Sequence, residues 1–360
     1  MIKNELCIIH IGMPKTGSST LQRVFFNSIK GTNTSYADLK VENQSAIIYS
    51  LFSEHPEKQT MHRELNSTQE EIERFNQKNK ELLINHFLNT RSNTTIISGE
   101  DIFHLTENGI RKMQIFLSDY FKKIIIVGYI RHPISYMNSA FQQLVKNHYM
   151  DSFDFNIIYP HYRLKLEKFD KVFGRNNVHF IEFNPKKFPN HDIVIDFSNR
   201  FNISFDYQKK KLVNESISKE LISILFIDNR FNKKHFGKNN MRVKENLIRN
   251  LSSIGKTKFY FSSKIIASVL DEYKNDINWL YNRMGEGFRN TNEAEDNKAF
   301  VNTEEELLHV SNDTFTRLIE IVGKNHIDKN LLVNTTENIA KILAEYKERI
   351  NLKVIEKRGE

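Results

Sequence analysis

The stretch from Cys7 to Gln22 constrains the fold of this chain more than any other. It reads CIIHIGMPKTGSSTLQ, an apolar run, then a turn with Gly12 and Gly17, then a helical pattern. This order predicts a strand, a tight turn and a helix N-terminus in succession. Helix N-termini bind anions because their first N–H groups are unpaired and carry a partial positive charge. The turn also supplies further donors for an anion: Lys15, Thr16, Ser18, Ser19 and Thr20.

The position of the lysine decides between the known types of phosphate loop. A Walker loop places its lysine directly after the second glycine, whereas Lys15 here comes before Gly17. The run Lys15-Thr16-Gly17-Ser18-Ser19 resembles the 5′-phosphosulfate loop of the sulfotransferases that use 3′-phosphoadenosine 5′-phosphosulfate (PAPS). The resemblance implies that Lys15 through Thr20 bind this nucleotide, with Lys15 at the bridging oxygen.

A second segment predicts a partner for this loop. Residues 122–130 are apolar without alternation, as in a buried parallel strand, and they end at Arg131-His132-Pro133. Pro133 is typical of a helix start, and Ser139 follows Arg131 by eight residues. An arginine at the strand end and a serine two turns into the helix can face one phosphate. The same pattern binds the 3′-phosphate in the sulfotransferase family, which implies this role for Arg131 and Ser139.

A third strand, near residues 94–98, is followed by Gly99-Glu100-Asp101. Carbohydrate-modifying sulfotransferases often place a glutamate after a comparable strand as the general base, and Glu100 matches that position, with Asp101 as its competitor. Burial would raise the pKa of such a carboxylate and improve it as a base. Alternative bases are histidines: His10, His104, His132 and His148.

The alternation of strands and helices predicts the fold class. We expect an α/β, P-loop-like three-layer fold with a central parallel sheet flanked by helices, plus a helical C-terminal region. The expected strands are residues 5–11, 94–98, 122–130 and 177–183, and the expected helices in this half are 18–30, 67–91, 107–120, 134–149 and 160–173. The expected domains are a sulfotransferase domain (1–285, with a PAPS-binding core 1–185 and a helical part 186–285), a linker (286–303) and a helical extension (304–360).

Composition limits the partners. The net charge of +8 suits an anionic ligand, but the basic residues are spread along the chain and no zinc-finger or RNA-binding pattern occurs, so we expect no nucleic acid. No metal-ligand spacing occurs either, and we expect no metal. Cys7 is the single cysteine, and no signal peptide or membrane span is seen. These features favour a cytoplasmic protein, and the abundance of Lys, Asn and Ile favours a bacterial one.

The preferred interpretation is an enzyme, a PAPS-dependent sulfotransferase that acts on a hydroxyl of a saccharide or glycoconjugate. The acceptor contacts are expected within residues 31–66 and 141–165, where candidates include His62 and Lys146. Two alternatives stay open: a P-loop kinase or NTPase, and a non-catalytic nucleotide-binding module. The C-terminal helices could also form a homo-oligomer.

Overall fold

The computed structural model describes residues 3–29, 33–206, 217–232, 240–289 and 298–356. Within it the chain divides into two compact units, each assembled from three stretches. The first unit comprises Met1–His132, His161–Lys211 and Asn275–Thr291, and the second comprises Pro133–Pro160, Leu212–Lys274 and Asn292–Glu360. These limits differ from the sequence boundaries at 285 and 303, and that domain division stays a prediction.

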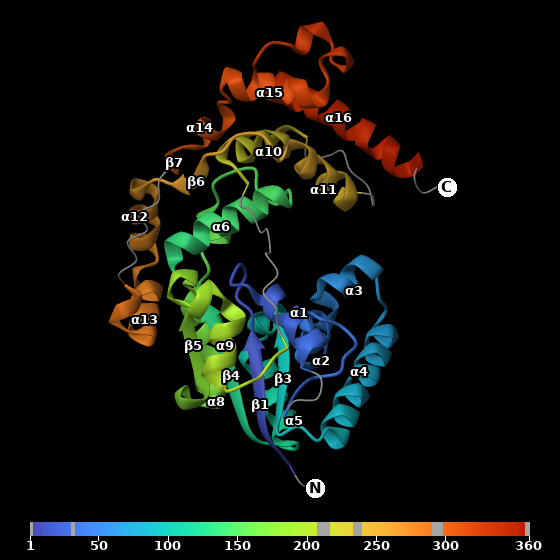
Figure 1. The fold of residues 1–360 in the computed structure, drawn as a ribbon, viewed down its shortest axis with the longest axis vertical. Coiled ribbons are helices and arrows are strands. Elements are labelled where there is room, and N and C mark those ends of the chain that lie inside the picture. Colours follow the sequence, from blue (N-terminus) through green and yellow to red (C-terminus); the bar gives the residue numbers. More distant parts are fainter. Residues whose placement is uncertain (1–2, 30–32, 207–216, 233–239, 290–297, 357–360) are drawn as a thin grey trace. The chain divides into compact units, whose positions relative to one another are not determined.

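In the described part of the first unit, five strands form one sheet in the order β2-β3-β1-β4-β5. Figure 1 labels β3, β1, β4 and β5 of this sheet. Every neighbouring pair is parallel. The strands are β1 (Asn4–Ile11), β2 (Thr34–Tyr36), β3 (Thr94–Gly99), β4 (Phe121–Ile130) and β5 (Val178–Glu182). The predicted fold class, a P-loop-like α/β fold with a central parallel sheet, is confirmed. Only the short edge strand β2 was not predicted among these five.

Helices cover both faces of this sheet. Ile8 of β1 belongs to a core that includes Leu21 of α1 (Ser18–Ser28) and Phe197 of α9 (Ile193–Phe201). Ile9 points to the opposite face, because successive strand residues alternate, and it is fully buried as well. On that side α5 (Glu107–Ser118) and α8 (Tyr162–Phe173) pack against β4. The three-layer arrangement explains why the central strands are continuous apolar runs.

The chain between β2 and β3 folds into helices at one edge of the first unit. These are α2 (Ser45–Phe52), α3 (Thr60–Leu65) and α4 (Gln69–Asn89), and α4 begins with a capping box in which Thr68 and Glu71 bond each other's backbone. His62 of α3, expected as an acceptor contact, is buried there and hydrogen-bonds Ser50 Oγ through Nε2 at 2.9 Å. It holds these helices together.

The second unit is mostly helical, as predicted. Its helices are α6 (Pro133–Lys146), α7 (Phe155–Ile158), α10 (Lys219–Phe231), α11 (Asn240–Leu251), α12 (Ser263–Glu272), α14 (Glu304–Leu308), α15 (Asn312–Val322) and α16 (Thr336–Glu356). A parallel strand pair, β6 (Lys258–Phe261) and β7 (Lys298–Val301), was not predicted. Residues 290–297 of the expected linker lie outside the described residues, and β7 lies near its end.

The remaining helical segments are α13 (Lys274–Met284) and short 3-10 helices. The latter are η1 (Pro56–Lys58), η2 (Glu100–His104), η3 (Arg175–Asn177), η4 (Pro185–Lys187), η5 (Pro189–His191), η6 (Glu286–Phe288), η7 (Lys324–His326) and η8 (Lys329–Leu331). No helix among the described residues combines the length and the apolar character needed to cross a membrane.

A buried ion pair joins α16 to α10 inside the second unit. The Lys347 ammonium lies 2.6 and 2.8 Å from the two carboxylate oxygens of Asp228, and both side chains are almost fully buried. Asn232 Nδ2 donates to the same carboxylate at 2.8 Å. Burial lowers the pKa of Lys347, and the Asp228 carboxylate opposes that shift. Such a pair stabilises mainly because neither charge is left alone in the core.

We expect Lys347→Met to lower the free energy of unfolding by about 3–5 kcal/mol, because Asp228 would remain as an unpaired buried charge. Replacing both residues, as in Lys347→Met with Asp228→Leu, should cost less than this single change. Urea unfolding followed by circular dichroism measures both. The control is Arg317→Ala, which removes an exposed ion pair with Glu320 and should change stability by less than about 1 kcal/mol. A double variant no more stable than Lys347→Met would contradict this account.

Candidate functional site

Three neighbouring strands of the first unit end at the same edge of the sheet, and each is followed by a residue predicted to act at a site. The loop after β1 carries Lys15, the turn after β3 carries Glu100, and β4 is followed by Arg131. Parallel strands place their carboxyl ends together, and ligands of α/β sheets bind at such an edge. Residues far apart in sequence are therefore delivered to one place.

The loop after β1 has an unusual backbone. Lys15 and Gly17 both have left-handed dihedral angles, with φ of 65° and 76°. A lysine rarely adopts this conformation, and such residues cluster at ligand sites. The buried Thr16 hydroxyl donates to Met13 O at 2.6 Å and holds the turn. Gly17 is the N-cap of α1 and offers no side chain to its amides, which suits a bound anion as their acceptor.

Arg131 is tied directly to this loop. Its Nη1 donates to the backbone oxygen of Lys15 at 3.1 Å. The guanidinium also lies over the ring of Phe183, 5.8 Å from the centroid. The backbone oxygen of Arg131 accepts a hydrogen bond from the Tyr162 hydroxyl at 2.7 Å, which anchors the end of β4 to α8. The structure thus brings the predicted loop and the predicted arginine together.

Glu100 approaches the loop from β3. A Cβ placed on Gly12 would lie 2.7 Å from Glu100 Cγ and 2.5 Å from Ser18 Oγ, so both side chains press on this glycine. Burial and the neighbouring Asp101 carboxylate raise the pKa of Glu100, and the Lys15 ammonium partly opposes that shift. A carboxylate with a raised pKa beside a lysine and a helix N-terminus is suited to accept a proton.

The other proposed bases lie in different surroundings. Asp101 accepts a hydrogen bond from Gln59 Nε2 at 2.9 Å. His10 is fully buried, bonds Ser98 Oγ through Nδ1 at 2.8 Å, and has a pKa lowered by burial to about 4. Burial also lowers the pKa of His132 to about 4, and this ring packs against Phe288.

Two further histidines complete the set of alternatives. His104 lies at the end of η2, where desolvation of the ring, followed by the nearby Lys165 charge, lowers its pKa. His148 lies in the second unit, where its Nε2 is 3.7 Å from a carboxylate oxygen of Asp228. Ser139 also belongs to the second unit, on α6. Its contact with a 3′-phosphate stays a prediction.

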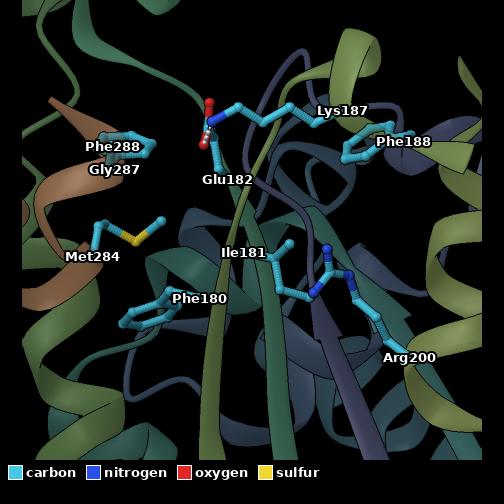
Figure 2. Close-up of a pocket in the computed structure, with 9 residues that line it drawn as sticks. All are labelled: Phe180, Ile181, Glu182, Lys187, Phe188, Arg200, Met284, Gly287 and Phe288. Carbon is cyan, nitrogen blue, oxygen red and sulfur yellow. Dashed lines mark hydrogen bonds and ion pairs between the residues drawn. The ribbon is translucent and has the colours of Figure 1, made fainter. Parts of the chain in front are cut away.

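A cavity of about 310 Å³ opens along the free edge of β5. Its wall contains three aromatic rings (Phe180, Phe188 and Phe288) and the ion pair between Glu182 and Lys187, which Figure 2 shows at the top of the view. The cavity is close to Arg131, because the ring of Phe188 lies 5.7 Å from that of Phe183, on which the guanidinium rests. It can hold a flat, partly apolar group.

The predicted site residues that belong to the first unit come together. Lys15, Thr16, Gly17, Ser18, Ser19 and Thr20 form one loop and helix start, and Glu100 and Arg131 border it. Sequence reasoning missed Phe183 and Ser45, whose Oγ accepts the Glu100 N–H at 2.6 Å. Among the described residues, no group of three His, Cys, Asp or Glu side chains is placed to hold a metal ion.

Comparisons with known proteins add little to this geometry. No protein-family model matches the chain, and no curated protein matches it. One solved structure that resembles it is described as "Crystal Structure of Sulfotransferase from Alicyclobacillus acidocaldarius". The identity is 16%, the TM-score is 0.39, and the likeness covers 66% of this chain and 98% of that one. At this TM-score the likeness does not bear on function.

We expect Gly12→Ala to destabilise the first unit by about 1–3 kcal/mol, because the added methyl group would collide with Ser18 and Glu100. Gly287→Ala is the matched control, since a Cβ there meets no atom within 4 Å, and it should change stability by less than about 0.5 kcal/mol. Urea unfolding of the two variants makes the comparison. Equal effects would mean that Glu100 does not pack against the loop.

Proposed function

We propose that this chain is a sulfotransferase, which transfers a sulfuryl group from PAPS to a hydroxyl of an acceptor. The observation that carries the proposal is the hydrogen bond of 3.1 Å from Arg131 Nη1 to Lys15 O. It joins two cationic features that could bind two phosphates of one nucleotide. The lysine precedes the glycine in this loop, an order that favours PAPS over ATP as the donor.

Each part of the site would contact a different group of the nucleotide. The amides from Gly17 to Thr20, with the hydroxyls of this segment, would hold the 5′-phosphate. The Lys15 ammonium would stabilise the negative charge that grows on the phosphate oxygen as its bond to sulfur breaks. Arg131 would bind the 3′-phosphate through its planar guanidinium, with Ser139 as a second contact. The aromatic cavity at the edge of β5 would hold the adenine ring of the nucleotide.

Glu100 would act as the general base. As the acceptor oxygen forms its bond to sulfur, the proton of that hydroxyl would pass to the Glu100 carboxylate, and the phosphate oxygen would leave with the electron pair of the broken bond. The reaction requires positioning and charge stabilisation more than covalent chemistry by the protein. The chain would need no metal ion for it, because Lys15 and the helix N-terminus supply positive charge.

We propose a saccharide or glycoconjugate as the acceptor. The support is the carboxylate base, since the resemblance noted in the sequence relates Glu100 to carbohydrate-modifying sulfotransferases. A panel of p-nitrophenyl glycosides, with radiolabelled sulfate in the donor, would identify a saccharide that the chain sulfates.

Calorimetric titration tests the nucleotide assignment. The chain is expected to bind adenosine 3′,5′-bisphosphate without Mg²⁺ and more tightly than ATP. Arg131→Ala should weaken this binding by about 10–100-fold, the value of charge-assisted hydrogen bonds, and should change AMP binding by less than about threefold. Tighter binding of ATP with Mg²⁺ would instead support a kinase or NTPase. Equal losses for the two nucleotides would mean that Arg131 does not contact the 3′-phosphate.

We expect Glu100→Gln to lower turnover by about 10²–10⁴-fold, because a base is removed, while the affinity for adenosine 3′,5′-bisphosphate is unchanged. Wild-type turnover should fall as the pH drops through the raised pKa of Glu100, since only the ionised carboxylate accepts a proton.

Stability gives an independent check on Glu100. A raised pKa in the folded state means that ionisation of this carboxylate opposes folding. The protonated Glu100 carboxyl contributes to stability at low pH, below the pKa that this group has in the unfolded chain. That contribution is lost as the pH rises through the pKa of Glu100 in the folded protein. Glu100→Gln should therefore be more stable than wild type at pH 8 and should lose this advantage at pH 4. Urea unfolding at the two pH values measures it, and an equal difference at both would contradict the raised pKa.

A further inference from the structure

The start of η2, where Glu100 lies, is contacted by a residue of α2. Ser45 is the first residue of α2, and its Oγ accepts two consecutive backbone N–H groups, from Glu100 at 2.6 Å and from Asp101 at 3.3 Å. These are the first two amides of η2. In most helices the N-cap side chain satisfies such amides, but here the hydroxyl comes from a residue 55 positions earlier in the chain.

Gly99 explains why the cap has to come from elsewhere. It is the N-cap residue of η2 and has no side chain to accept the amides. Its lack of a side chain is also required, because a Cβ on Gly99 would lie 2.8 Å from Ser45 Cα and 2.9 Å from Ser45 N. Gly99 therefore permits the close approach through which Ser45 reaches the start of η2.

The Ser45 hydroxyl is held in one orientation. Its proton is donated to Asn43 Oδ1, which also accepts the Ser45 backbone N–H at 3.0 Å. The lone pairs of Oγ are then left for Glu100 and Asp101. Gln44 fixes the same segment to β3, since its N–H donates to Ser98 O at 3.1 Å and its Oε1 accepts the Ser98 N–H at 3.2 Å.

From these contacts we infer that Ser45 is a positioning residue for the base of the proposed reaction: it fixes the backbone of Glu100 so that the carboxylate leaves β3 toward the loop that carries Lys15. Glu100 Cγ lies against Gly12, so a small rotation at the start of η2 would move the carboxylate along the loop. The inference rests on the proposed function. It adds Ser45 to the residues that the proposed reaction needs, although no sequence pattern around Glu100 indicates it.

The test uses the full chain, PAPS and the p-nitrophenyl glycoside that wild type sulfates fastest. Ser45→Ala should lower kcat by about 10–100-fold, the cost of a misplaced catalytic group, and should leave the affinity for adenosine 3′,5′-bisphosphate within about twofold. In a chain that already carries Glu100→Gln, Ser45→Ala should lower kcat no further, because the group that Ser45 positions is gone. An equal fold-loss in both backgrounds, or an unchanged kcat, would overturn the inference.

Two further variants separate positioning from folding. Ser50→Ala is the matched control on α2: Ser50 is buried and bonds His62 and Asn76. It should lower the Tm about as much as Ser45→Ala does and leave kcat unchanged. Asn43→Ala changes an exposed residue and frees the Ser45 hydroxyl to rotate, so it should also lower kcat, again only where Glu100 is present. A loss of kcat in Ser50→Ala equal to that in Ser45→Ala would overturn the inference.

Failure of the inference and failure of the proposed function give different results. If wild type transfers sulfate and Ser45→Ala does so equally well, the positioning role is wrong and the sulfotransferase proposal stands. If wild type neither binds adenosine 3′,5′-bisphosphate nor transfers sulfate to any glycoside of the panel, both are wrong. A sulfotransferase whose rate is insensitive to Glu100→Gln would refute the role of Glu100 and the role of Ser45 with it.

Discussion

The parallel pairing of β3, β1 and β4 is the constraint on which the site depends. In this register Ile11 lies opposite Gly99 and His10 opposite Val127, so the three strands finish within a few residues of one another. Burial on both faces holds the register, because a slip by one residue would turn each side chain to the opposite face. Ile96 and Ser98, which face α1 and α9 beside Ile8 and His10, would then point into the other helix layer. Because the register is fixed in this way, the loop after β1, Glu100 and Arg131 lie together at one edge of the sheet.

The parts of the site that the sequence predicts are those with local signatures. The loop from Gly12 to Thr20 combines a strand, a turn and a helix start in one continuous stretch, and Arg131 follows a strand with its own apolar pattern. The fold class follows from the same alternation, and the structure confirms it. Ser45 has no such signature, because its role appears only when the chain folds α2 against the end of β3. The strand β2 is three residues long and too short to show a period.

The site is built at a cost to stability that the surrounding core offsets. Lys15 has a left-handed backbone conformation, which is unfavourable for a residue with a side chain. Burial opposes the ionised form of Glu100. Nearby, the ring of the buried His10 lies among Phe25, Tyr129 and Phe197. Local rules are broken at the edge where a ligand would bind, as is expected of a functional site. The buried His10 is a further exception below that edge, because its Nε2 has no hydrogen-bond partner among the described residues.

The C-terminal helices follow a different logic. Their apolar periodicity predicts packing without saying against what, and an oligomer through them stays a prediction. In the structure Ile339, Ile342 and Leu343 of α16 are buried, and α16 packs on α10 and α11 of the same unit. The Lys347–Asp228 pair holds α16 to α10. The strand β7, which lies inside the expected linker, pairs with β6, which precedes that linker in the chain. Residues 304–352 therefore complete the hydrophobic core of the second unit, and removing them would expose apolar side chains of α10 together with the carboxylate of Asp228.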